Sequence, residues 1–398
     1  MAEQRSGSTE AASNVRERPI VESGSAVKAR GLEGVIALES EICFIDGQAG
    51  VLVYRGYDIH DLAENTCFEE TAYLLWNGRL PNHAELDDLN ETLRRERPVP
   101  ERIIDLLRAA PPDASPTAVL RTATSALAHF DPEADDMSPE SNYRKSVRLQ
   151  AKIPTVIAAH GRLRKGQEPV APLQEGSIAH EFLYMLNGER PGRAAERTFD
   201  ACLVLHAEHG LNASTFAGRV IGSTLSDIYS AVTGAIGALK GPLHGGANIG
   251  VIRMLLEINK SGLDPAEHVK DKLSRKERVM GFGHRVYKTL DPRAAILREM
   301  MEELSEERGE RAWYDMTAKI VDTMEGEKGL YANVDFFSAS VYYMLGIDPD
   351  LYTPIFALSR TAGWTAHLLE QWTENRLIRP RAEYVGPRGL KVPHIQDR

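Results

Sequence analysis

The sequence predicts a predominantly α-helical protein with a short β-hairpin near its N-terminus. Apolar residues recur at helical spacing over most of the chain, as they do in residues 316–324. β-favouring residues gather only in residues 35–54, around the turn dipeptide Asp46-Gly47. Strands and helices do not alternate along the chain, which argues against a doubly wound α/β sheet.

The expected helices follow from apolar spacing, proline near several starts, and glycine or proline near several ends. They span residues 62–76, 103–107, 117–130, 146–160, 265–279, 292–307, 316–324, 336–345 and 354–372. Pro154 is expected to bend the fourth of them. From about residue 249 to residue 328 the helices carry many charges, which indicates a smaller, more exposed domain inserted into a larger one.

Composition excludes several classes of function. A formal charge of −10 argues against a nucleic-acid or anionic-membrane partner. No apolar run approaches the roughly 18 residues that a membrane span needs. Residues 1–30 are polar, contain acids and lack an apolar core, so we expect a disordered tail rather than a targeting signal. The three widely spaced cysteines are typical of reduced thiols in a cytoplasmic protein.

Three stretches combine glycine with histidine or aspartate among apolar neighbours. The first, GPLHGGAN, follows an apolar helix and presents His244 on a loop, where it could polarise a carbonyl or cap a helix. The second, GFGHRVYK, places His284 between glycines and the cations Arg285 and Lys288, which suits an anion or a solvated turn. Because no strand precedes it and no GxGxxG is present, NAD is a poor candidate.

The third stretch, YANVDFFS, carries Asp335 just before an apolar helix. Its ordinary role there is a helix N-cap. The functional alternative is a carboxylate base whose basicity the flanking phenylalanines raise by excluding water. Near the second stretch, Arg293 follows Asp291-Pro292 at a helix start, a fair place to hold a carboxylate.

Two further features bear on function. His206 and His209 lie three residues apart, as a metal pair could, but HExxH is absent and no cysteine is near. Arg360 interrupts an apolar helix, which predicts a buried partner carboxylate or a bound anion. Two histidines, one aspartate and several arginines suit proton abstraction next to a thioester, followed by attack on a ketone whose carboxylates the arginines neutralise.

The three stretches together resemble the citrate synthase family. Its motifs occur here in the family's order and spacing, as GPLHGGAN, GFGHRVYKxxDPR and NVDFxS. The resemblance runs from about Gly31 to the C-terminus, includes ENRLIRPRAEYVGP, and is greatest to the bacterial, dimeric, Gram-positive type. It implies a metal-free, cofactor-free acyltransferase that condenses acetyl-CoA with oxaloacetate to give citrate and CoA, a reaction of the tricarboxylic acid cycle.

The resemblance also implies roles for single residues. His244 would stabilise the acetyl-CoA enol, Asp335 would take the methyl proton, and His284 would polarise the oxaloacetate carbonyl. Oxaloacetate would be bound by five residues: His209, Asn212, Arg293, Arg360 and Arg379. The last of these would reach the site of the partner subunit in a homodimer. CoA would be bound by Val279, Gly281, Gly283 and Lys288.

The fold implied is a two-domain helical bundle. A large domain of residues 31–244 and 341–398 would hold the dimer interface, and a small domain of residues 245–340 would close over substrate. The sequence departs from the commoner family pattern at Gly210, Ile249 and Phe337, none of which is a named catalytic group.

Three alternatives remain open. A 2-methylcitrate synthase would use propionyl-CoA with the same three catalytic residues, and dual activity is compatible with the motifs. A metal-dependent hydrolase would bind zinc through His206, His209 and His244. A regulator derived from the same fold would bind CoA or a dicarboxylate without releasing thiol.

Overall fold

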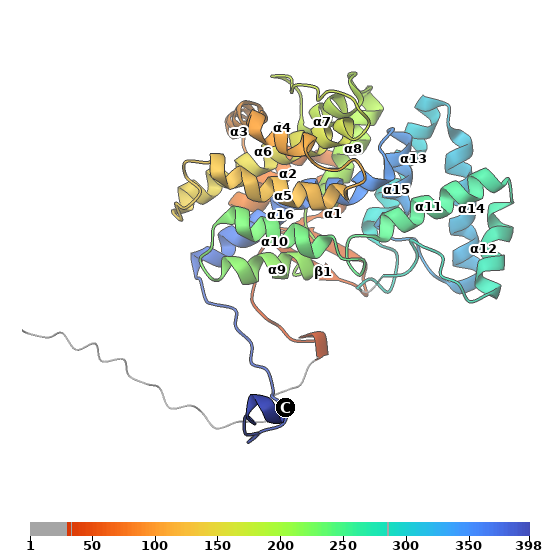
Figure 1. Ribbon diagram of the computed structural model, residues 1–398. Helices are drawn as coiled ribbons and strands as arrows, with labels where there is room; N and C mark the ends of the chain where they lie inside the picture. The colour runs from red at the N-terminus through yellow and green to blue at the C-terminus, as the bar shows by residue number, and fades with distance from the viewer. Residues whose placement is uncertain (1–29, 33, 285) are drawn as a thin grey trace, which may run out of the picture. The chain divides into compact units, whose positions relative to one another are not determined.

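The structure is a computed structural model that describes residues 30–32, 34–284 and 286–398 (Figure 1). It divides into two units, Met1–Glu39 and Ser40–Arg398. In the first unit the described residues include one turn of 3₁₀ helix, η1 (Arg30–Leu32). The predicted disordered tail otherwise lies outside the described residues, as does Arg285.

The unit Ser40–Arg398 is predominantly helical, which confirms the predicted class. Its first helices are α1 (Ile59–Asn65), α2 (Phe68–Asn77), α3 (His83–Glu96), α4 (Glu101–Arg108), α5 (Pro116–Leu127), α6 (Pro139–Leu163), α7 (Ile178–Asn187) and α8 (Arg193–His206). Those that follow are α9 (Ala213–Gly222), α10 (Ile228–Leu239), α11 (Ala247–Ser261), α12 (Pro265–Ser274), α13 (Pro292–Arg308), α14 (Arg311–Lys328), α15 (Val334–Met344) and α16 (Tyr352–Thr373). Short 3₁₀ turns are η2 (Ala128–Phe130), η3 (Pro349–Leu351) and η4 (Ile395–Asp397).

The predicted hairpin is present as an antiparallel sheet of β1 (Cys43–Asp46), β2 (Val51–Tyr54) and the short β3 (Tyr57–Asp58), in that order. The register pairs Cys43 with Tyr54 and Asp46 with Val51. The Asp46 carboxylate accepts the N–H groups of Gln48 and Ala49 and so fixes the turn. The Lys288 N–H donates to the Gly47 carbonyl at 2.8 Å, which attaches the turn to the loop that carries His284.

Three helical boundaries differ from the sequence prediction for clear local reasons. The helix expected over residues 265–279 ends at Ser274, because Lys276 has a positive φ of 59° and the Glu277 N–H turns back to the Lys272 carbonyl. Residues 62–76 form two helices, because the chain is extended at Thr66 and Cys67 and the Cys67 N–H donates to the Glu70 carboxylate. The helix expected from residue 146 already begins at Pro139, where the Ser138 hydroxyl caps it. It continues past Pro154 to Leu163.

Helix α16 lies among the helices that surround the site. It packs against α2, α6, α8, α9 and α10 (Figure 1), and most of its residues are buried. Helices α11 to α15 pack largely on one another, and α13 also packs on α8. Since Ser40–Arg398 form one compact unit, the predicted division into large and small domains stays a prediction. Among the described residues, no helix is long and apolar enough to cross a membrane.

Candidate active site

His244 lies in the glycine-rich loop between α10 and α11. Its backbone N–H donates to the Gly241 carbonyl at 2.9 Å. Its Nε2 atom lies 3.3 Å from the Ser214 N–H and 2.8 Å from the Ser214 hydroxyl. A backbone N–H can only donate, so Nε2 accepts and Nδ1 keeps the hydrogen. Burial and then the charge of Arg360 lower the His244 pKa to about 4, so the ring is a neutral donor through Nδ1.

His284 has the opposite tautomer for a similar reason. Its Nδ1 atom accepts from the N–H groups of Val286 and Tyr287, at 3.0 and 3.1 Å. The hydrogen of the neutral ring therefore lies on Nε2. Burial and then the charge of Arg293 lower the pKa of His284 to about 4. The turn after His284 thus fixes a second neutral N–H donor.

Asp335 is not the N-cap of its helix, so its ordinary structural role is excluded. The cap of α15 is Asn333, whose side-chain oxygen accepts the Asp335 N–H at 3.0 Å. Within the described chain the Asp335 carboxyl makes no hydrogen bond, and burial raises its pKa to about 6, although Arg293 opposes the shift. This is the environment of a carboxylate whose basicity is raised by desolvation.

Arg293 is buried and forms a fork with Asp291. Its Nε and Nη2 atoms donate to the two Asp291 oxygens at 3.0 and 2.9 Å, and both side chains are at most 3% exposed. Asp291 is also the N-cap of α13 and accepts the Val334 N–H at 3.2 Å. One carboxylate therefore joins the starts of α13 and α15, next to Asp335. The described residues give Nη1 of Arg293 no hydrogen bond, so this atom could bind another anion.

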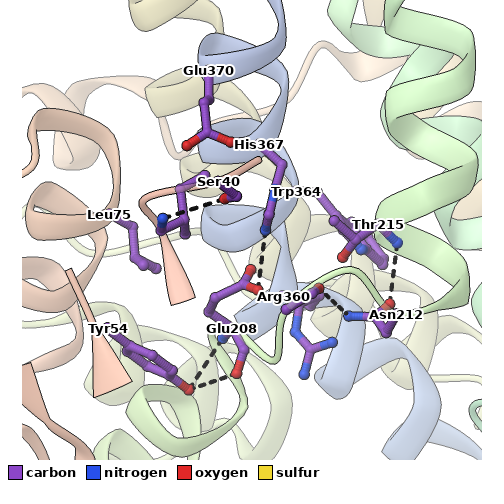
Figure 2. A network of polar contacts seen from close by, with 12 residues as sticks. Ser40, Tyr54, Leu75, Glu208, Asn212, Thr215, Arg360, Trp364, His367 and Glu370 are labelled. Carbon is purple, nitrogen blue, oxygen red and sulfur yellow. Dashed lines mark hydrogen bonds and ion pairs between the residues drawn. The ribbon is translucent and has the colours of Figure 1, made fainter. Parts of the chain in front are cut away.

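Arg360 is fully buried on α16, as its place in an apolar helix predicted. Its Nε donates to the His206 carbonyl at 2.7 Å, and its guanidinium lies 4.6 Å from the ring centre of Phe356. Within the described chain no carboxylate forms an ion pair with it, and the carboxylate whose charge acts on it is that of the buried Glu208, drawn near it in Figure 2. Burial lowers the Arg360 pKa, and the charge of Glu208 opposes that shift.

His209 and Asn212 occupy the segment between α8 and α9. The His209 ring packs edge-on against His284 with the centroids 5.6 Å apart, and its Nε2 lies 3.2 Å from the Tyr287 hydroxyl. Burial, with Arg293 next, lowers the His209 pKa well below its ordinary value. Asn212 caps α9 by accepting the N–H groups of Ser214 and Thr215.

The predicted CoA residues lie on one segment. Val279 is buried, and Lys288 is exposed. Gly281 and Gly283 have φ of +86° and +75°, and the chain there pairs with residues 331–333. A Cβ at Gly281 would lie 2.8 Å from a Phe336 carbon, so the close approach of this segment to α15 requires glycine.

Arg379 is not brought to these residues by any described contact. It is exposed and follows α16 in the C-terminal segment, which leaves the helical body (Figure 1). The described residues give it no hydrogen bond or ion pair. The structure therefore gathers every other predicted site residue onto neighbouring segments and leaves this one apart.

The metal alternative lacks a ligand group in the described part of the chain. No cluster there joins three or more histidine, cysteine, aspartate or glutamate side chains. His206 is buried, and its Nδ1 lies 2.7 Å from the Cys202 carbonyl. The three cysteines are free thiols.

The comparisons with known proteins agree with this geometry. The family model described as citrate synthase, C-terminal domain, matches residues 31–381. Citrate synthase 2 of Bacillus subtilis is 54% identical over 93% of this chain and 99% of its own. The chain belongs to the citrate synthase family. A citrate synthase of Haloferax volcanii is 53% identical over 93% of this chain and 98% of its own, and a citrate/2-methylcitrate synthase of B. subtilis is 45% identical over 90% and 96%.

A solved citrate synthase structure has the same fold. The ternary complex of the Thermoplasma acidophilum citrate synthase with carboxymethyl coenzyme A and oxaloacetate aligns with a TM-score of 0.85 and 36% identity. The alignment covers 92% of this chain and 98% of that one. The citrate synthase fold predicted from the three motifs is therefore confirmed.

Sequence reasoning missed four supporting residues of this citrate synthase site. Ser214 fixes the His244 ring, Tyr287 contacts His209, Asn333 caps α15 in place of Asp335, and Glu208 lies beside Arg360. Only Asn333 had a usable signal, because asparagine two residues before Asp335 is itself a preferred N-cap. The others depend on contacts between segments distant in the chain.

Proposed function

We propose that this chain catalyses the citrate synthase reaction, in which acetyl-CoA, oxaloacetate and water give citrate and CoA. The observation that carries the proposal is the presence, in one site, of a desolvated Asp335 carboxyl that makes no hydrogen bond to the described residues and of two neutral histidines with fixed tautomers. Membership of the citrate synthase family supports the same reaction.

In the first step Asp335 removes a proton from the acetyl methyl group. The electron pair moves onto the thioester oxygen, where the Nδ1–H of His244 donates a hydrogen bond to the forming enol. A pKa near 6 makes Asp335 a stronger base than an ordinary carboxylate while leaving it mostly ionised at pH 7. A neutral histidine donor suits an enol better than a cation would. It stabilises the oxygen, whereas a nearby cation would also lower the pKa of Asp335 and so weaken the base.

In the second step the enol carbon attacks the ketone of oxaloacetate. The Nε2–H of His284 donates to the ketone oxygen and gives it its proton as the new carbon–carbon bond forms, and the proton that Asp335 took from the methyl group then returns His284 to its neutral form through solvent. Water then hydrolyses the citryl thioester, which releases citrate and CoA. Both histidines have pKa values of about 4, so both remain neutral donors throughout the physiological range.

Oxaloacetate would be bound by the buried arginines. The free Nη1 of Arg293 and the Nη groups of Arg360 would face its carboxylates, with His209 and Asn212 beside them. We further propose that Arg379 completes the site of the partner subunit in a homodimer. Its exposure on the C-terminal segment, outside its own chain's site, supports that role.

CoA would lie along residues 279–288. The exposed Lys288 would face its phosphates, and the backbone at Gly281 and Gly283 would approach it closely. The Thermoplasma acidophilum complex with carboxymethyl coenzyme A and oxaloacetate supports this pair of ligands. We propose that residues 245–340 close over bound oxaloacetate, which would limit thioester hydrolysis before condensation.

The proposed function is tested by product analysis with two acyl donors. Purified protein with oxaloacetate and acetyl-CoA should give citrate, identified by mass spectrometry, and EDTA should leave the rate unchanged. The same assay with propionyl-CoA in place of acetyl-CoA tests for 2-methylcitrate synthase activity, because one relative is a citrate/2-methylcitrate synthase. Product from propionyl-CoA alone would reassign the enzyme, and no product from either would refute the proposal.

A further inference from the structure

Glu208 is a buried acid with no role in the proposed chemistry. It is fully buried, and its Oε2 atom has no hydrogen-bond partner among the residues that the structure describes. Its backbone is fixed by Tyr54, whose hydroxyl donates to the Glu208 carbonyl at 2.7 Å and accepts its N–H at 3.2 Å (Figure 2). A buried, half-satisfied carboxylate is costly and calls for a compensating charge.

A chain of hydrogen bonds fixes Glu208 as an acceptor. Glu370 accepts from Nη1 of Arg219, which also lies 3.0 Å from Nδ1 of His367. An arginine can only donate, so Nδ1 of His367 accepts and its hydrogen lies on Nε2. That Nε2–H donates to Oε1 of Glu208 at 3.1 Å.

The second oxygen of Glu208 lies against α16 close to Arg360. A Cβ on Gly363, three residues after Arg360, would be only 2.2 Å from Oε2, so glycine at 363 is what lets the carboxylate approach. Figure 2 shows Glu208 and Arg360 side by side. Among the described ion pairs, however, none joins them within 4.0 Å, and Arg360 is held instead by the His206 carbonyl and Phe356.

We propose that Glu208 is the resident counter-charge of Arg360, which compensates the buried guanidinium without occupying its Nη groups and weakens oxaloacetate binding so that the site can turn over. The ligand's identity rests on the proposed function. When a substrate carboxylate binds Arg360, two anions share one cation, and their repulsion reduces affinity. Without Glu208, the substrate alone would compensate the cation.

The test is Glu208→Gln, which keeps the shape and the acceptor for His367 but removes the charge. Calorimetric titration with oxaloacetate, without acetyl-CoA, should show a dissociation constant about tenfold lower than in the wild type, since removal of one close charge is worth on the order of a factor of ten. The ligand-free variant should also unfold at a lower temperature. Glu208→Asp retains the charge and should bind within about threefold of the wild type.

Glu370→Gln is the matched control, because it removes an equal charge at the other end of the same hydrogen-bond chain. Its oxaloacetate affinity should stay within about twofold of the wild type. Equal or weaker binding by folded Glu208→Gln would overturn the proposal. If Glu208→Gln does not fold, the double variant Glu208→Gln/Arg360→Met should fold, because it removes the uncompensated cation. Its failure to fold while Arg360→Met folds would also overturn the proposal.

The two proposals fail separately. Wild-type protein that binds oxaloacetate but makes no citrate would refute the proposed function, and the ratio of the two dissociation constants would still decide the role of Glu208. Wild-type protein that makes citrate while Glu208→Gln binds no more tightly would refute the counter-charge alone.

Discussion

Replacing Asp335 with asparagine should stabilise the folded protein at neutral pH while abolishing turnover. The carboxyl is desolvated and makes no hydrogen bond to the described residues, so its ionised form is costly in the folded state. Asparagine has nearly the same shape and carries no charge. The variant therefore removes the cost together with the proposed base.

The magnitude follows from the pKa of Asp335, which burial raises from 3.8 to about 6. At about 1.4 kcal/mol per unit, ionisation costs the folded state up to about 3 kcal/mol. The folded pKa of Asp335 lies above the unfolded one. The wild-type protein therefore avoids this cost below about pH 3.8, where the carboxyl is protonated in both states, and bears it fully once the pH has risen through about 6. The advantage of asparagine should thus grow from pH 4 to 6 and be constant above that.

The assay is urea unfolding of both proteins at equal concentration, followed by circular dichroism between pH 4.5 and pH 8. The free-energy difference between variant and wild type should rise by about 2 kcal/mol over this range, because part of the effect is already present at pH 4.5. Asp322→Asn on the exposed face of α14 is the control and should show a flat difference. A flat difference for Asp335→Asn as well would refute the view that Asp335 is a desolvated base.

Further predictions concern activity and stability. Initial rates at low acetyl-CoA should fall on the acid side with a midpoint near pH 6, because only ionised Asp335 accepts a proton; a midpoint near pH 4 would contradict this. Gly281→Ala should lower the melting temperature several degrees more than Gly283→Ala in scanning calorimetry, because only the former meets a neighbour within 4 Å; equal shifts would argue against close packing there. Inactive Arg360→Ala and Arg379→Ala chains, mixed in equal amounts, should regain about a quarter of the wild-type sites if each site uses both subunits; no recovery would count against a shared site.

The fold could be predicted from local patterns because helical spacing and one turn dipeptide were strong signals. The hairpin formed at Asp46-Gly47, and the apolar C-terminal helix formed as α16. The predicted ends of helices were less accurate where a capping residue, rather than the apolar pattern, determines where the helix begins. Ser138 and Pro139 begin α6 seven residues earlier than the apolar pattern alone indicates.

The candidate site was predictable in its residue types and less so in its supporting contacts. The position of Arg360 in an apolar helix predicted a buried carboxylate or a bound anion nearby, because an uncompensated guanidinium there is costly. No local pattern identified Glu208, which is 152 residues away in the chain. The tautomers of His244 and His284 were also beyond sequence reasoning. They depend on which backbone N–H groups face each ring, and the Ser214 N–H reaches His244 from another helix start.

The most direct test of the central claim is thiol release by wild-type protein and Asp335→Asn, each given acetyl-CoA with and without oxaloacetate. The wild type should release thiol rapidly only when oxaloacetate is present. Asp335→Asn should bind oxaloacetate normally in calorimetry and release thiol at least about a thousandfold more slowly, since loss of the base removes most of the general-base contribution. Rapid, oxaloacetate-dependent release by Asp335→Asn would contradict the account.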